Sequence, residues 1–202
     1  MCGIAGFVSS EDRGAQLPSR ETLMCSIEEL KHRGPDSEGL WLDEGVGFGH
    51  TRLAIRDLSS HGSQPMISNS GRYVLAYNGE IYDLDEMKRP LERHGYQLRG
   101  HSDTEVLLGS IEVMGLEATL QNANGMFAFA VLDRHERIAM LARDRAGEKP
   151  LYWTISNGVL YFASELRSLK IMLPESPTVD QSAVAAYLRH NYVPGPFSIY
   201  KG

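Results

Sequence analysis

Residues 125–163, GMFAFAVLDRHERIAMLARDRAGEKPLYWTISNGVLYFA, decide the fold class of this chain. They contain four apolar segments of strand length, at 125–133, 137–142, 150–155 and 159–163, with polar or Gly-containing turns between them. Asn157-Gly158 separates the last two segments, and Asn-Gly is the strongest short signal for a two-residue hairpin. Consecutive strands joined by such short turns predict an antiparallel sheet.

The first half of the chain adds further short strands and one helix. A strand is predicted at 2–8, two strands with a bend at 39–55, and a strand at 72–82 broken by Asn78-Gly79. A polar loop is expected at 59–71. The helix is predicted at 19–32, ended by Gly34 and Pro35, with one apolar face made of Leu23, Met24, Ile27 and Leu30.

Helices also separate the two groups of strands. Asp83 and Glu86 have the spacing of a capping box for a helix ending near Gly95, in which Pro90 predicts a kink or an early stop. Ser102 caps a second helix, whose face carries Leu107, Ile111 and Met114. A last helix is expected near 180–190. Because strands and helices do not alternate regularly, the order indicates an α+β fold with antiparallel sheets.

The bulk composition excludes several classes of protein. The chain has 202 residues, 42% hydrophobic and 23% charged, which suits one sizeable core or two small ones. It has no apolar run of about 18 residues and no signal-peptide pattern, so we expect no membrane partner. A net charge of -6 without a basic cluster argues against nucleic acid. The two cysteines are too few for a disulfide framework, which favours the cytoplasm.

Cys2 is the first candidate for chemistry, because it follows the initiator methionine directly. Removal of Met1 favours a small second residue and would leave a thiol and a free α-amine on Cys2. An α-amine titrates near roughly 7.7–8.0, so it can accept the thiol proton and activate the nucleophile without a histidine. The alternative is that Cys2 is a small apolar residue beginning a strand, and position alone favours that alternative.

Nine strings change this interpretation of Cys2. In chain order they are MCGIAGFV, HRGPDSEG, GHTRLAIRDLS, QPM, YNGEIYD, HSDTEV, NGMFAFAVLD, ARDR followed after Ala146 by GEKPLYW, and FASEL. Together they resemble the class II glutamine amidotransferases, in the form typical of the amino-terminal domain of asparagine synthetases. The resemblance runs from Cys2 to Leu169 and more weakly beyond. It implies an N-terminal-nucleophile hydrolase fold, a four-layer α-β-β-α sandwich of two antiparallel sheets.

The resemblance also implies the catalytic roles. Cys2 matches the cysteine that attacks the side-chain amide carbon of glutamine. Asn78 and Gly79 match the oxyanion hole, which offers a side-chain NH₂ and a backbone N–H; one such donor is typically worth about 10²–10³ in rate. Taken alone, Asn78-Gly79 favours a hairpin turn instead, although a turn can also present donors.

Residues for binding the glutamine head group follow in the same way. Arg52 matches the arginine that holds the α-carboxylate, for which a planar guanidinium fork is suited. The backbone that lines the same carboxylate matches Leu53, Ala54, Ile55 and Arg56. Without the motif, Arg52 would be a solvated charge at a strand end.

Asp103 matches the acid that binds the α-ammonium, and Glu80 lies beside that position. Alone, Asp103 would be a helix-start carboxylate favoured by the helix dipole, which is compatible with a ligand role. The RGPDSEG turn at 33–39 is interpreted as structural support for the site. Cys25 receives no role. No histidine has metal-ligand spacing with a cysteine or an acid cluster, so no metal is predicted.

The resemblance places residues 1–190 in the amidotransferase domain and 191–202 at the start of a linker to an absent ATP-dependent synthetase domain. Such a domain would use ATP and magnesium; this one needs no cofactor. Its partners would be glutamine and the synthetase domain, with a homodimer left open. The implied reaction supplies ammonia for amidation of a carboxylate, here aspartate.

Three alternatives stay open. The glucosamine-phosphate synthase and phosphoribosyl amidotransferase branches share the cysteine chemistry, but HRGPDSEG and GHTRLAIRDLS favour the asparagine synthetase branch. Within that branch the acceptor could be a sugar acid or another carboxylate. The domain could also be a catalytically silent scaffold if Met1 is retained. Ala146 departs from the bulkier apolar residue usual at its position, which would leave a small void or a different loop.

Overall fold

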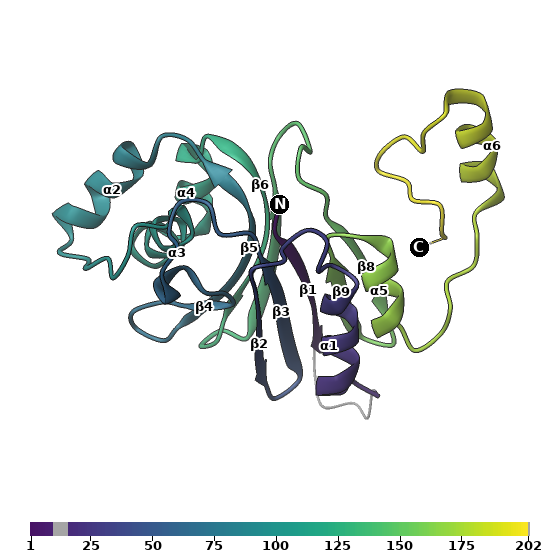
Figure 1. Ribbon diagram of the computed structural model, residues 1–202, viewed down its shortest axis with the longest axis horizontal. Helices are drawn as coiled ribbons and strands as arrows, with labels where there is room; N and C mark the ends of the chain where they lie inside the picture. The colour runs from purple at the N-terminus through teal and green to yellow at the C-terminus, as the bar shows by residue number, and fades with distance from the viewer. Residues whose placement is uncertain (10–15, 202) are drawn as a thin grey trace.

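The computed structural model describes residues 1–9 and 16–201, and they form two antiparallel sheets packed face to face (Figure 1). The first sheet has the order β2-β3-β1-β9-β8, built from Ser37–Asp43, Val46–Arg52, Gly3–Ser9, Val159–Ala163 and Tyr152–Ser156. The second has the order β4-β5-β6-β7, built from Met66–Ile67, Tyr73–Ile81, Gly125–Asp133 and Ile138–Arg143. The predicted α+β class and its antiparallel sheets are confirmed.

Helices cover the outer face of each sheet, which completes the predicted four layers (Figure 1). Helices α1 (Arg20–Glu28) and α5 (Leu166–Met172) lie on the first sheet, and their core includes Phe7, Leu23 and Tyr161. Helices α2 (Leu84–Arg93), α3 (Asp103–Met114) and α4 (Leu116–Asn122) lie on the second.

The third core lies between the two sheets, and strand alternation determines which side chains enter it. Ile4 and Val8 of β1 lie there with Val74 and Ala76 of β5, whereas Ala5, Phe7 and Leu75 face the helices. Phe48 and Phe162 meet edge to face in this layer, with ring centroids 5.2 Å apart. Side chains an even number of residues away from these along the same strand therefore also point toward the opposite sheet.

Most local predictions are confirmed. Ser102 caps α3 by accepting from the Glu105 amide at 3.2 Å, as predicted, and α1 lies within the helix predicted at 19–32, with Ser19 accepting from the Thr22 amide at 3.1 Å. Asn157 and Gly158 take positive φ values of 51° and 77°, as a two-residue hairpin between β8 and β9 requires.

Three local predictions are wrong, and a fourth is narrowed. Strand β5 runs unbroken through Asn78-Gly79, which pair with Ala128 and Phe127 instead of forming a turn. Asp83 makes no capping hydrogen bond. The early stop that was one of the two outcomes predicted for Pro90 does not occur, because α2 continues to Arg93 and Leu84, Met87 and Leu91 bury its apolar face. Met24 is 45% exposed and is not part of the α1 core face.

Several short elements were not predicted from the sequence. The predicted polar loop at 59–71 contains a short 3₁₀ turn, Ser60–Gly62, and the strand β4. Helices α4 and α5 were not predicted, because each has only 7 residues and therefore too short an apolar period to stand out. Ala146 lies in the turn between β7 and β8 and lines a groove beside Leu120 of α4.

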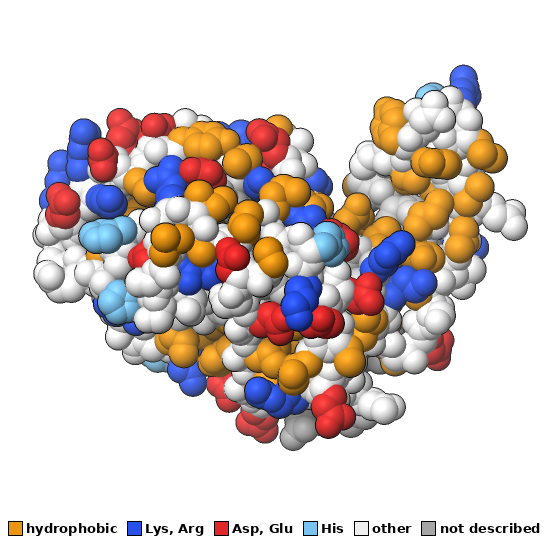
Figure 2. Space-filling view, in the orientation of Figure 1, with side chains coloured by type: hydrophobic (Ala, Val, Ile, Leu, Met, Phe, Trp, Pro, Cys, Tyr) orange, Lys and Arg blue, Asp and Glu red, His pale blue; other side chains and the backbone are white. Residues whose placement is uncertain are grey.

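The carboxy-terminal arm stands apart from the sandwich (Figure 1). Its helix α6 (Gln181–His190) lies where the sequence predicted a last helix, and Asp180 caps it by accepting from the Ser182 amide at 2.9 Å. The following residues fold back, and the Asp180 amide donates to Ile199 at 2.9 Å. Figure 2 shows hydrophobic side chains over this arm, where Leu188 is 76% and Phe197 67% exposed. None of the helices in the described residues has the length and apolar character to span a bilayer.

One ion pair of the second sheet gives a pH-dependent stability. Arg72 donates to both oxygens of Asp133 at 2.6–3.0 Å, and this bonding lowers the pKa of Asp133 from 3.8 to about 2. The pair therefore stabilises the fold above pH 4, and its contribution is lost as the pH falls toward 2. We expect Arg72→Met to lower the free energy of unfolding at pH 7 by about 1 kcal/mol, because the arginine is partly solvated.

Urea unfolding at pH 7 and at steps down to pH 3 measures this difference between Arg72→Met and the parent. The difference should shrink with falling pH. Lys88→Met is the control, because Lys88 pairs at 3.9 Å with Asp85, whose side chain is 95% exposed. A difference for Arg72→Met that does not depend on pH would contradict the assignment.

Candidate active site

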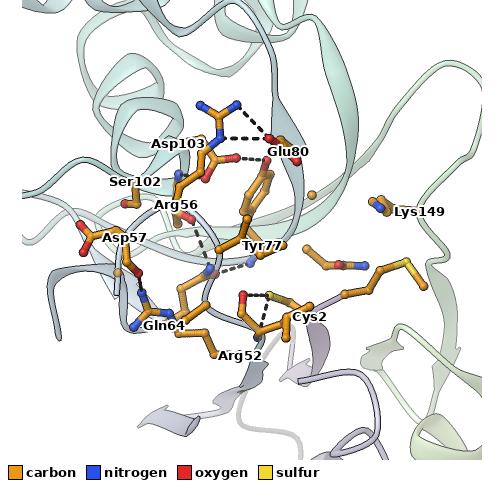
Figure 3. A pocket seen from close by; sticks show the side chains of 18 of the residues that line it. Cys2, Arg52, Arg56, Asp57, Gln64, Tyr77, Glu80, Ser102, Asp103 and Lys149 are labelled. Atoms are coloured by element: carbon orange, nitrogen blue, oxygen red, sulfur yellow. Dashed lines mark hydrogen bonds and ion pairs between the residues drawn. The ribbon is translucent and has the colours of Figure 1, made fainter. Parts of the chain in front are cut away.

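The candidate site is a cavity at one end of the sandwich, between the two sheets (Figure 3). Strand alternation explains why functional side chains meet there. Cys2 lies two residues before Ile4, and Arg52 lies four residues after Phe48, so both share the inward side of their strands. Asn78 and Glu80 lie two and four residues after Ala76 and share the inward side of β5. Residues from both sheets thus point into the layer between them. The cavity is lined by every site residue predicted from the sequence: Cys2, Arg52, Leu53, Ala54, Ile55, Arg56, Asn78, Gly79, Glu80 and Asp103.

Cys2 immediately precedes β1, the middle strand of its sheet, so its position is tightly fixed. The Leu53 amide donates to its Sγ at 3.4 Å. Arg33 donates from Nε to the Cys2 carbonyl at 3.0 Å and from Nη1 to Glu165 at 2.9 Å. The 33–39 turn therefore holds the backbone of Cys2, which agrees with its interpretation as structural support.

Burial is the largest influence on the Cys2 thiol and raises its pKa above 9.0. The hydrogen bond with Leu53 and the positive charge of the terminal ammonium act in the opposite direction. While Met1 is attached, that ammonium belongs to Met1 and is one residue away from the thiol. The thiol of this form is therefore protonated at neutral pH.

Asn78 is 1% exposed, and its Nδ2 is a buried donor with no acceptor among the described residues. A buried amide without a partner is costly, so such groups commonly await a ligand. This NH₂ group is on the inner face of β5, and both Asn78 and Cys2 line the cavity. It can therefore donate to an oxygen that enters the cavity.

The amide of Gly79 is the second donor directed at the cavity. In a strand, alternate amides point to the same edge. On either side of Gly79, the Tyr77 amide donates to Gln64 Oε1 at 2.7 Å and the Ile81 amide donates to Asp103 Oδ2 at 3.1 Å. Phe127 pairs with Gly79 across the sheet, but its amide donates to the Asp144 carboxylate and its carbonyl accepts from the Asp144 amide. The Gly79 amide thus points between Gln64 and Asp103.

Gly79 also has a packing requirement. A Cβ at this position would lie 2.5 Å from the Met126 carbonyl oxygen and 2.7 Å from the Phe127 Cβ. Any larger residue would push β5 away from β6 and displace the neighbouring Asn78.

Asp103 begins α3, and its carboxylate faces the cavity while it is held from three sides. Tyr77 donates its hydroxyl to Oδ2 at 2.8 Å, and the Thr104 amide donates to Oδ1 at 3.0 Å. Burial and the neighbouring Asp103 raise the pKa of Tyr77 well above 10, so its hydroxyl stays a donor. The site is thus given a fixed negative charge, and the helix-start and ligand interpretations of Asp103 are compatible.

The Arg52 guanidinium lines the cavity but is engaged with the adjacent loop. Nη1 donates to the Ser59 carbonyl at 2.9 Å, and Nη2 donates to the Asp57 carbonyl. The Ala54 amide, in the segment predicted to line a carboxylate, donates to Asp36 at 2.8 Å. Arg52 therefore fixes the loop and keeps its other N–H groups for a ligand.

Several residues that support the site were not predicted. His50 is buried, which lowers its pKa to about 4, and neutral His50 donates from Nε2 to the Tyr77 carbonyl at 3.1 Å, joining the two sheets beside Asn78. Gln64 links β5 to Thr104 of α3 at 3.2 Å. Lys149 lines the cavity at 7% exposure. Tyr77, Gln64 and Lys149 occur in YNGE, QPM and GEKPLYW, which is the signal that could have indicated them.

The described residues contain no group of three His, Cys, Asp or Glu suited to a metal.

Comparison with solved structures shows the class of fold. The glutamine phosphoribosylpyrophosphate amidotransferase of B. subtilis superposes with a TM-score of 0.70 at 22% identity, over 85% of this chain and 43% of that one. A structure described as the allosteric regulatory enzyme of purine biosynthesis gives 0.66 at 21% identity, with the same coverage. The fold is that of the N-terminal-nucleophile hydrolases.

Sequence comparison gives the family. The model of the glutamine amidotransferase domain matches residues 1–202, and the chain belongs to that family. Asparagine synthetase (glutamine-hydrolysing) 1 of Bacillus subtilis is 38% identical over 98% of this chain and 31% of the relative. A putative asparagine synthetase 2 of Methanocaldococcus jannaschii is 32% identical over the whole chain and 41% of the relative. The chain thus spans about a third of the length of these relatives.

The raised pKa of Cys2 predicts its reactivity while Met1 is attached. We expect alkylation of Cys2 by iodoacetamide, in a Cys25→Ser background, to have a pH midpoint above 9, because burial disfavours the thiolate. A short cysteine peptide is the control, and mass spectrometry verifies Met1. A midpoint at or below that of the peptide would contradict the assignment.

Proposed function

We propose that this chain hydrolyses the side-chain amide of glutamine to glutamate and ammonia, with Cys2 as the nucleophile after removal of Met1. The observation that carries the proposal is the unpartnered, buried Nδ2 of Asn78 in the cavity that Cys2 lines. An oxyanion formed by attack on an amide carbon needs such a donor, and the Gly79 amide offers a second.

The chemistry follows from the residues of the cavity. Once Met1 has left, the α-amine belongs to Cys2 and accepts the proton of its thiol. The sulfur attacks the amide carbon, and Asn78 and Gly79 stabilise the resulting oxyanion. The α-ammonium returns the proton to the leaving nitrogen, which departs as ammonia. Water then cleaves the thioester, releasing glutamate and restoring the thiol.

Charges in the cavity support recognition of an amino acid over a simple amide. Arg52 offers a cation for the α-carboxylate, and the backbone of residues 53–56 forms the adjoining wall. Asp103 offers an anion for the α-ammonium, with Glu80 beside it. A zwitterion bound between these charges presents its side chain toward Cys2.

For the whole protein, we propose that the ammonia amidates aspartate in an ATP- and magnesium-dependent synthetase domain that follows residues 1–190 through the segment beginning at 191. The relatives named asparagine synthetase support this. A different carboxylate acceptor is the second candidate. Not every relative is named an asparagine synthetase, since one that is 34% identical over 83% of this chain is named amidase chry2, of Gibberella zeae. Two free cysteines and metabolic relatives support a cytoplasmic location, and a homodimer stays a prediction.

The first test is ammonia release from glutamine by protein whose loss of Met1 has been verified by mass spectrometry. The parent should release ammonia without ATP, and Cys2→Ala should abolish this release. The thermal unfolding temperature of Cys2→Ala should equal that of the parent, because only the nucleophile is removed. Cys25→Ser is the matched control and should keep full activity, since Cys25 is exposed on α1. Normal turnover by Cys2→Ala would end the proposal.

The second test concerns Asp103. We expect Asp103→Asn to raise the KM for glutamine about 10- to 100-fold, the range of one hydrogen bond to a charged group, because it removes charge but keeps the shape. Steady-state kinetics beside thermal unfolding separates this effect from loss of fold. An unchanged KM would show that Asp103 only begins a helix.

A further inference from the structure

The mouth of the cavity carries an ion pair that the catalytic scheme does not use. Arg56 donates from Nε and Nη2 to the same oxygen of Glu80, at 3.0 and 2.8 Å. Figure 3 shows the pair next to Asp103. Its two side chains are 36% and 32% exposed, so solvent reaches both.

The pair joins the two walls of the cavity. Arg56 comes from the loop after β3, in the sheet that carries Cys2, and Glu80 comes from β5 in the opposite sheet. Glu80 shares the inner face of β5 with Asn78 and lines the cavity. It is therefore placed to contact a ligand between the sheets, and Arg56 competes for it.

Charge balance gives the consequence. Asp103 and Glu80 are the acids that line the cavity near the expected α-ammonium, and Asp57, which also lines it, accepts from Ser59 and His101. The guanidinium of Arg56 offsets the charge of Glu80, and its positive charge also interacts with Asp103. A ligand ammonium entering this corner therefore meets less negative charge than two free carboxylates would supply.

We propose that Arg56 is a positioning residue that weakens glutamine binding by holding Glu80 in an ion pair, so that the Arg56–Glu80 pair sets the affinity of the site for an α-ammonium group. This inference rests on the proposed glutaminase function. The side chain of Arg56 acts through Glu80, whereas its backbone belongs to the wall beside the expected α-carboxylate. Removing its charge releases Glu80 to the α-ammonium.

The test compares two substrates in Arg56→Gln. Glutamine carries the α-ammonium, whereas glutaramate has the same carboxylate and side-chain amide without it. We expect the KM for glutamine to fall about two- to fivefold, the range of an exposed ion pair, with kcat unchanged. The KM for glutaramate should stay the same or rise. Arg56→Lys keeps the charge and should lower the KM for glutamine less than Arg56→Gln does.

A double-mutant cycle tests whether the effect passes through Glu80. Glu80→Gln should raise the KM for glutamine, and Arg56→Gln should have a smaller effect in that background, because only its interaction with Asp103 is then left. Arg134→Leu is the matched control, because Arg134 is a comparably exposed arginine whose ion pair with Asp43 lies away from the cavity. It should leave the KM for both substrates unchanged.

Three results would overturn the inference: a higher or unchanged KM for glutamine in Arg56→Gln, an equal fall for both substrates, or an effect of undiminished size in Glu80→Gln. Calorimetric titration of glutamine into Cys2→Ala, with and without Arg56→Gln, measures binding without turnover. Failure of the parent to release ammonia would count against the proposed function. Failure of Arg56→Gln to tighten binding counts against the inference alone.

Discussion

The alternation of side chains along β1 and β5 is the constraint on which the rest of the structure depends. β1 is the middle strand of its sheet, buried on both faces, so its register cannot slip without moving an entire apolar set to the wrong side. That register points Cys2 toward the opposite sheet. The same alternation on β5 points Asn78 back toward it. The proposed nucleophile and the proposed oxyanion donor are thus positioned by the two strands that form the core.

Supporting contacts convert this arrangement into a rigid site. His50 ties β3 to the Tyr77 carbonyl, Arg33 holds the Cys2 carbonyl, and Gln64 ties β5 to the start of α3. Each contact connects segments far apart in the sequence. An error in any of them would move a donor relative to the thiol, and hydrogen bonds to a developing charge lose their value within fractions of an ångström.

The sequence allowed the strands to be predicted better than their ends or partners. The segments 125–133 and 159–163 coincide with β6 and β9, because strong apolar runs are bounded there by turn residues. The turn predicted at Asn78-Gly79 was wrong, because the local preference of these residues for a turn is outweighed by pairing with β6, which keeps both residues extended. The residues indicated by the motif resemblance all line one cavity, but the resemblance did not indicate the engagement of Arg52 with carbonyl oxygens or the Arg56–Glu80 pair. Those contacts depend on the path of the loop after β3, which has no periodicity to interpret.

Burial of Cys2 explains why an α-amine suits this site better than a distant base. The same packing that excludes water from the sandwich penalises the thiolate, so an isolated thiol here is a poor nucleophile at neutral pH. A base one residue away, as in the Met1-bearing chain, supplies positive charge but is not on the nucleophile itself. Removal of Met1 brings the amine onto the same residue as the sulfur, where it can take the proton and later return it. The rigid strand that buries the thiol then also fixes the base, and a separate side chain for that role becomes unnecessary.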